Sequence, residues 1–121
     1  MIIGIDHIQL AMPAGQETLA RAFYVGVLGL TEVPKPQVLA QRGGVWFESG
    51  SAKVHLGVEA DFRPARKAHP GFLVSDLREV IARCEAAGIA IISDEPLAGY
   101  ERIHIHDPFG NRIELLQVIA E

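Results

Sequence analysis

The sequence predicts an α+β fold built from two βαβββ modules. A strand-like segment, a helix-like segment closed by glycine and three further strand-like segments follow one another, and the same order then begins again. The 121 residues suit one compact domain and are too few for two independent cores. We therefore expect a single domain over residues 1–121, with module one at about 1–58, a linker at 59–68 and module two at about 69–121.

Module one begins with a strand and a helix. Residues 5–12 are apolar and rich in isoleucine and are stopped by Pro13, which predicts a strand. Residues 16–28 carry apolar side chains at helical spacing, and Gly29 follows as a C-cap, which predicts a helix. After a loop marked by two prolines, three short strand-like segments complete the module. These segments are residues 38–42, 44–48 and 53–58.

Module two repeats this order after a charged linker that contains a proline. Residues 70–75 predict its first strand. Asp76, with Glu79 three positions later, is typical of a helix N-terminus, and the helix runs to about Ala87 before Gly88. Three strand-like segments follow, at residues 89–92, 100–106 and 112–119.

The composition excludes several classes of protein. With 49% apolar and 21% charged residues, a net charge of −4 and a pI near 5.7, the chain is typical of a globular protein without affinity for nucleic acid. No apolar run approaches the roughly 18 residues that a membrane span needs. The first residues show neither the basic segment nor the cleavage site of a secretion signal. We therefore expect a cytoplasmic protein that binds neither membranes nor nucleic acid.

The single cysteine, Cys84, belongs to an apolar stripe at helical spacing. A lone cysteine forms no internal disulfide and fits a reducing compartment. Free cysteines are usually buried, so we interpret Cys84 as a core residue rather than a nucleophile.

Four potential metal ligands occupy matching places in the two modules. His7 and His69 lie at the first strands, and His55 on the last strand of module one corresponds to Glu114 in module two. Side chains alternate along a strand, so each of the four points away from its apolar neighbours. A two-fold relation between the modules would bring them to one centre. Three imidazoles and a carboxylate suit zinc, nickel, manganese, iron or cobalt.

Two further histidines, His104 and His106, share a face of one predicted strand but have no counterpart in module one. Of these, His104 is a candidate for the substrate pocket. Trp46 and Phe47 are adjacent and point to opposite faces, so one should be core and the other, taken as Trp46, should line the pocket.

Three motifs resemble the vicinal oxygen chelate superfamily, which includes glyoxalases, bleomycin resistance proteins and extradiol dioxygenases. They are Asp6-His7-Ile8 followed by Phe23-Tyr24 and Leu28-Gly29-Leu30, then His69-x-x-Phe72-x-Val74-x-Asp76-Leu77, then Asp107-Pro108-x-Gly110-Asn111-x-Ile113-Glu114-Leu115. Together they cover essentially the whole chain. The resemblance implies that the strands form a curved mixed sheet around a central site.

The resemblance also implies a metal bound by His7, His69 and Glu114. The fourth position, usually Glu or Gln in glyoxalase-like members, is His55 here. The group at that position can act as the base, and histidine can serve because its pKa lies near neutrality. We therefore take His55 and Glu114 as the candidate catalytic residues and His55 as a fourth metal ligand.

Metal-dependent lyase or isomerase chemistry of the glyoxalase type is the leading expectation, with the metal chelating two neighbouring substrate oxygens. Extradiol-type dioxygenation is an alternative, because His7, His69 and Glu114 form the required triad. A metal-free drug-binding protein of the bleomycin-resistance kind is another. A homodimer is expected, since members of the family often pair modules across subunits, and the site could lie within one chain or be shared.

Arg63 and Arg66, in the linker just before His69, are candidates for substrate binding. Guanidinium groups bind carboxylates and phosphates bidentately, so this pair could clamp an anionic substrate. A solvated basic loop paired with Glu59 and Asp61 is the alternative.

Overall fold

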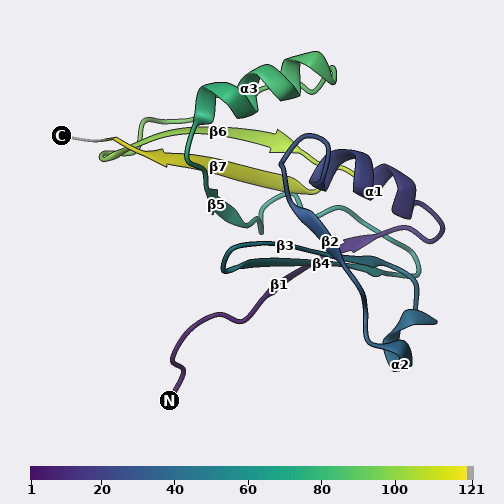
Figure 1. Cartoon of the computed structure of the whole chain (residues 1–121). Coiled ribbons are helices and arrows are strands. Elements are labelled where there is room, and N and C mark those ends of the chain that lie inside the picture. Colours follow the sequence, from purple (N-terminus) through teal and green to yellow (C-terminus); the bar gives the residue numbers. More distant parts are fainter. Residues whose placement is uncertain (120–121) are drawn as a thin grey trace. The chain divides into compact units, whose positions relative to one another are not determined.

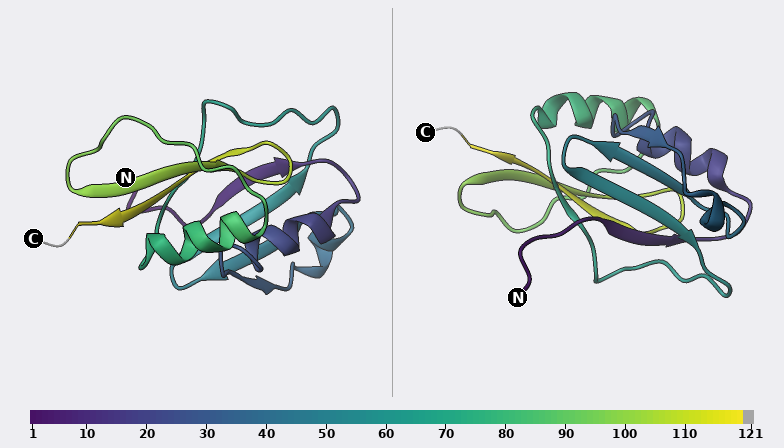
Figure 2. Two further views of the ribbon diagram at one scale, coloured as in Figure 1. Left: turned by 90° about the horizontal axis from the view of Figure 1, so that it is seen from above. Right: turned by 60° about the horizontal axis from the view of Figure 1, so that its bottom comes forward.

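The computed structural model describes residues 1–119, so the last two positions of the predicted second module lie outside the described residues. Its contacts divide the chain into two compact units, Met1–Pro64 and a second that begins at Ala65. Residues 59–70, which connect the strands of the two units, contain no helix or strand (Figure 2). The fold is mixed α+β, with one sheet in each unit and few helices.

Unit one holds a four-stranded mixed sheet in the order β1-β4-β3-β2 (Figure 1). Strands β1 and β4 are parallel, while the β4–β3 and β3–β2 pairs are antiparallel. The elements are β1 (Ile8–Met12), α1 (Glu17–Tyr24), β2 (Thr31–Val33), α2 (Gln37–Ala40), β3 (Val45–Ser49) and β4 (Ala52–Val58).

One face of this sheet forms an apolar core with α1. Phe47 is fully buried and stacks on Tyr24 of α1, with ring centroids 5.3 Å apart. Met12 and Val54 are likewise fully buried. The predicted division between adjacent aromatic residues is confirmed, since Phe47 lies in the core and the half-buried Trp46 points to the other face.

The prediction of a strand at 38–42 was wrong, because residues 38–40 belong to helix α2. Pro36 precedes the helix, and its carbonyl oxygen accepts the amide protons of Leu39 and Ala40. A short apolar run without alternation fits either structure, and Leu, Ala and Gln favour helix. The edge strand is instead β2, which sequence reasoning missed because its three residues show too little pattern.

Unit two holds a three-stranded sheet in the order β5-β7-β6, with β5 parallel and β6 antiparallel to β7. Helix α3 contacts β7 (Figure 1). The elements are β5 (Gly71–Leu73), α3 (Leu77–Ala86), β6 (Tyr100–His106) and β7 (Arg112–Val118). Asp76 caps α3 as predicted, because its carboxylate accepts the amide protons of Arg78 and Glu79.

The predicted strand at 89–92 was also wrong, since only Ile92 forms an isolated bridge, to His104 of β6. The amide of Ile89 bonds to the carbonyl oxygen of Cys84, so the segment begins tied to the end of α3. Even so, the bridge occupies the place in unit two that β2 occupies in unit one. The internal duplication therefore holds at the level of topology, with β1-β4-β3-β2 matched by β5-β7-β6 and the Ile92 bridge.

The residue just before β3 is a glycine for two reasons, its backbone conformation and its closeness to the neighbouring strand. Gly44 has φ +82°, and a Cβ there would lie 2.1 Å from the backbone oxygen of Leu56. Only glycine permits this backbone conformation together with so close an approach to the neighbouring strand. The turn that leads into β3 therefore depends on this residue.

Within residues 1–119, no helix is long and apolar enough to cross a membrane.

Cys84 is fully buried on α3, and burial raises the pKa of its thiol. We expect the native protein to resist a thiol reagent such as Ellman's reagent near neutral pH, because the reactive thiolate is both disfavoured and inaccessible. Denaturation in urea should expose one reactive thiol per chain. Rapid labelling of the native protein would contradict the assignment of Cys84 to the core.

Candidate metal centre

Glu114 lies in the middle of β7, on the polar face of its strand. Its neighbours Ile113 and Leu115 are buried on the opposite face, which agrees with the predicted alternation. Its side chain is 12% exposed. Glu114 is in register with Gly71 of β5 and with His104 of β6, so three strands position its surroundings.

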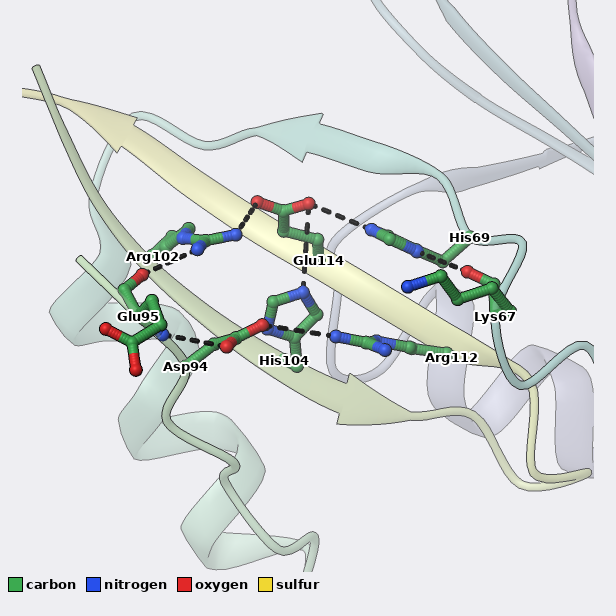
Figure 3. A network of polar contacts seen from close by, with 8 residues as sticks. All are labelled: Lys67, His69, Asp94, Glu95, Arg102, His104, Arg112 and Glu114. Atoms are coloured by element: carbon green, nitrogen blue, oxygen red, sulfur yellow. Dashed lines mark hydrogen bonds and ion pairs between the residues drawn. The ribbon is translucent and has the colours of Figure 1, made fainter. Parts of the chain in front are cut away.

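His69 precedes β5 and points its ring at Glu114 (Figure 3). Its Nδ1 bonds to the carbonyl oxygen of Lys67 at 2.8 Å, and its Nε2 lies 3.0 Å from Oε1 of Glu114. Because a carbonyl oxygen only accepts, Nδ1 carries a proton. A proton or a cation between Nε2 and the Glu114 oxygen makes this contact favourable, because a bare ring nitrogen and a carboxylate oxygen both only accept.

Arg102 of β6 holds the other oxygen of the same carboxylate. Its Nη1 donates to Oε2 of Glu114 at 3.1 Å, and its Nη2 donates to the carbonyl oxygen of Glu95 at 2.5 Å. Burial raises the pKa of Glu114, but the hydrogen bonds from Arg102 and His69 and the neighbouring charges outweigh it, so that the pKa lies below its usual value. The carboxylate is therefore ionised, and its Oε1 faces Nε2 of His69.

His104 completes this group from β6. It is 2% exposed, and its Nε2 lies 3.8 Å from Oε1 of Glu114. Burial, together with the nearby charge of Arg112, lowers the pKa of His104, so its ring is neutral near pH 7. Its buried Nδ1 has no hydrogen-bond partner among residues 1–119. This atom lies 3.8 Å from Oδ2 of Asp94, which accepts from Arg112 at 3.3 Å (Figure 3).

The donor atoms of His69, His104 and Glu114 all lie within 4.8 Å of one another. Two ligands about 2.1 Å from one ion can be at most about 4.2 Å apart. The separations of 3.0 and 3.8 Å from the Glu114 oxygen meet this limit. Two imidazole nitrogens and a carboxylate oxygen are donors that divalent transition metals accept, so the donor types and the distance from each histidine to Glu114 fit a metal ion.

In unit one, three aromatic rings stack on the polar face of the sheet. His55 lies between His7, at a centroid distance of 4.3 Å, and Trp46, at 3.8 Å and nearly parallel. His55 is 7% exposed. Burial lowers its pKa, and the neighbouring His7 lowers it further, so the ring is neutral near pH 7. His7 is more exposed and contacts the carboxylate of Asp6 at 3.0 Å.

The structure therefore brings the predicted ligands together in two pairs, His7 with His55 in unit one and His69 with Glu114 in unit two. The prediction that all four share one ion joins the two units and stays a prediction. His104, assigned to the substrate pocket from the sequence, lies beside the second pair.

Sequence reasoning found no counterpart of His104 in module one, but strand register supplies one. His104 pairs with Glu114 as Trp46 pairs with His55. The corresponding positions are thus His7 and His69, His55 and Glu114, and Trp46 and His104. The match was missed because the partners differ in residue type.

Arg102 and Asp94 were not identified from the sequence. Arg102 lies two residues before His104 on a strand, so alternation placed it on the same face. Asp94 lies in a loop, and no sequence pattern marks it. The two candidate clamp residues are exposed, with Arg63 in the first unit and Arg66 in the second.

Comparison with known proteins identifies the family. The family model of the glyoxalase/bleomycin resistance protein/dioxygenase superfamily matches residues 4–115 of the sequence. The chain therefore belongs to this superfamily, as its sequence motifs indicated. Members of the superfamily bind small molecules, typically use divalent metals and often act as dimers. No curated protein matches the chain.

Solved structures agree with this assignment. A protein from Bacillus anthracis described as of the glyoxalase family is 44% identical, with 98% of each chain covered and a TM-score of 0.93. A virulence protein from Salmonella typhimurium is 26% identical, with 98% of this chain and 99% of that chain covered and a TM-score of 0.73. A genomically encoded fosfomycin resistance protein from Listeria monocytogenes shares the fold at 18% identity, with coverages of 100% and 95% and a TM-score of 0.72.

Proposed function

We propose that the protein is a metal-dependent small-molecule enzyme, with lyase or isomerase chemistry of the glyoxalase type. The observation that carries this proposal is the contact between Nε2 of His69 and Oε1 of Glu114, 3.0 Å apart, with Nδ1 of the same histidine anchored on Lys67. In metal-ligating histidines, a hydrogen bond from the ring nitrogen that does not bind the metal fixes the tautomer, and the bond from Nδ1 to the Lys67 carbonyl oxygen is of this kind.

Two sets of metal ligands can be built on His69 and Glu114. The first adds His7 and His55, as the matching module positions predict. The second adds His104, whose Nε2 lies 3.8 Å from the same Glu114 oxygen. Zinc, nickel, manganese, iron and cobalt all accept either set. Substituting His7 and His104 separately and measuring metal affinity distinguishes the two sets.

A bound divalent ion would supply Lewis-acid stabilisation of charge that develops on a chelated substrate oxygen. The chain's own residues supply the rest. Arg102 orients the Glu114 carboxylate and keeps it ionised. His55, kept neutral by burial, is the proposed base that accepts a substrate proton, and Glu114 is the alternative.

Extradiol-type dioxygenation is the enzymatic alternative, because two histidines and one carboxylate, as in His7, His69 and Glu114, are the ligand set of non-haem iron oxygenases. A screen of metal-reconstituted protein against methylglyoxal–thiol adducts, catechols and fosfomycin tests these activities. We expect turnover of one substrate class, lost in His69→Ala and retained in His106→Ala, which removes an exposed histidine. Tight drug binding without metal or turnover would instead indicate a sequestering protein.

We also propose that the protein is a cytoplasmic homodimer. An exposed apolar segment at the N-terminus supports the dimer, because such surfaces mark interaction sites. It comprises Met1, Ile2, Ile3 and Ile5. The buried free thiol of Cys84 supports a reducing compartment. Light scattering of the purified protein tests the oligomeric state.

The clamp formed by Arg63 and Arg66 stays a proposal that rests on their charge and exposure. Substituting both by Ala would leave the affinity for an identified anionic substrate unchanged if they form only a solvated loop.

A further inference from the structure

Unit one contains a cavity of about 200 Å³ that the proposed metal centre does not use. Its lining includes the polar residues Lys35, Arg42 and Gln9 and the apolar residues Leu39 and Trp46. Among the described residues, no aspartate or glutamate belongs to the lining. Two cationic residues therefore line one small cavity in a chain of net charge −4, and such residues bind carboxylates and phosphates.

The loop between β2 and β3 positions the cations. The Lys35 ammonium donates to the carbonyl oxygen of Gly43, which fixes the side chain and leaves two of its three donors free of this bond. Glu17 lies beside the wall without lining it, since its carboxylate accepts the amide proton of Gly44 at 2.8 Å and a Cβ at Gly43 would lie 3.2 Å from its Oε2. The lining residues themselves carry two positive charges and no negative one.

The side chain of Gln9, on β1, lies over the neighbouring strand β4 at Gly57, because glycine has no side chain to block it. A Cβ at Gly57 would lie 2.5 Å from Nε2 of Gln9, so the amide occupies the space of the missing side chain. The amide can donate to a bound oxygen as well as accept. Lys35, Arg42 and Gln9 thus line the cavity from three segments of unit one.

Trp46 connects the cavity to the candidate base. It lines the cavity and also stacks on His55 at 3.8 Å, with an interplanar angle of 2°. Gln9 and Trp46 are both in register with His55, one on each neighbouring strand. A ligand in the cavity would therefore lie on the same face of the sheet as His55, separated from it by the indole ring.

We propose that this cavity binds a small organic anion, a carboxylate or a phosphonate, with its charge on Lys35 and Arg42 and its apolar part against Trp46 and Leu39. At about 200 Å³ the cavity is smaller than common drug-sized sites of roughly 300–1,000 Å³, so it takes a molecule about as large as benzoate. Binding of the anion needs no metal. Only the further step, that the anion is part of the substrate, rests on the proposed function.

The test uses Trp46, the single tryptophan of the chain, as the reporter. Metal-depleted full-length protein is titrated with benzoate and, separately, with phenylphosphonate, at constant ionic strength, while tryptophan fluorescence is followed. Benzamide is the uncharged control of the same shape. We expect a saturable change with at least one anion and none with benzamide, and the two anion arms show which headgroup the site prefers.

Variants assign the signal to the cavity. We expect Arg42→Gln to weaken anion binding roughly tenfold and the double variant with Lys35→Gln roughly a hundredfold, as for the loss of charge-assisted hydrogen bonds. Arg78→Gln, an exposed residue of α3, removes the same charge from unit two and should leave the affinity unchanged. Circular dichroism checks that each variant is folded.

The proposal is overturned if neither anion gives a saturable signal, if benzamide binds as tightly, or if the double variant keeps wild-type affinity. His69→Ala separates this site from the metal centre, because it should abolish metal binding and leave anion binding intact. A neutral substrate found in the activity screen would overturn the assignment to the substrate while leaving the anion site in place.

Discussion

Glu114→Gln is expected to abolish tight binding of a divalent metal. The substitution keeps the shape of the side chain but removes the charge of a ligand whose Oε1 lies 3.0 Å from Nε2 of His69 and 3.8 Å from Nε2 of His104. Loss of an outer-shell partner alone lowers metal affinity about 10–100-fold, so loss of an anionic ligand should lower it by roughly 100-fold or more. Isothermal titration of the metal-free protein with Zn²⁺ measures the change.

Glu101→Gln is the matched control for this substitution. Glu101 is an exposed residue of β6 in the same unit, so the variant makes the same chemical change away from the cluster. Its metal affinity should equal that of the wild-type protein. Equal affinities of the Glu114→Gln and wild-type proteins would remove Glu114 from the ligand set.

Asn111→Ala is expected to lower the free energy of unfolding by about 3 kcal/mol, because it removes two hydrogen bonds of a buried amide. Asn111 is 1% exposed. Its Nδ2 donates to Oδ2 of Asp107 at 2.9 Å, and its Oδ1 accepts the amide proton of Ala65 at 3.0 Å. Such a loss is large beside a typical total stability of about 5–15 kcal/mol.

Urea unfolding followed by circular dichroism measures this effect, with Gln41→Ala as the control. Gln41 is an exposed amide just after α2, and its removal should change the unfolding free energy by less than about 0.5 kcal/mol. A similar small change for Asn111→Ala would show that the turn before β7 does not depend on these hydrogen bonds.

The long, strongly patterned segments of the fold were predictable from the sequence. Strands β6 and β7 and the capped helix α3 lie where alternation and capping residues placed them. The short segments were not, because a run such as residues 38–42 is too brief for its period to separate helix from strand. Strand β2 is three residues long, and the residues at 89–92 form only one bridge.

The candidate site was predictable in part. Matching positions in the two modules identified His69 and Glu114, which lie in contact, and His7 and His55, which stack. The role of His104 beside Glu114 follows from strand register, which a sequence does not state. The cavity beside Trp46 depends on how a loop folds over the sheet, and no spacing in the sequence indicates it.

Metal titration of the wild-type protein tests the central claim most directly. The protein is stripped of metal, reconstituted in turn with zinc, nickel, manganese, iron and cobalt, and its metal content is measured after removal of free ions. We expect one ion per chain for at least one of these metals, and we expect His69→Ala to lose it. Failure of all five to bind stoichiometrically would contradict a metal centre at His69 and Glu114, and with it the enzymatic function proposed for this chain.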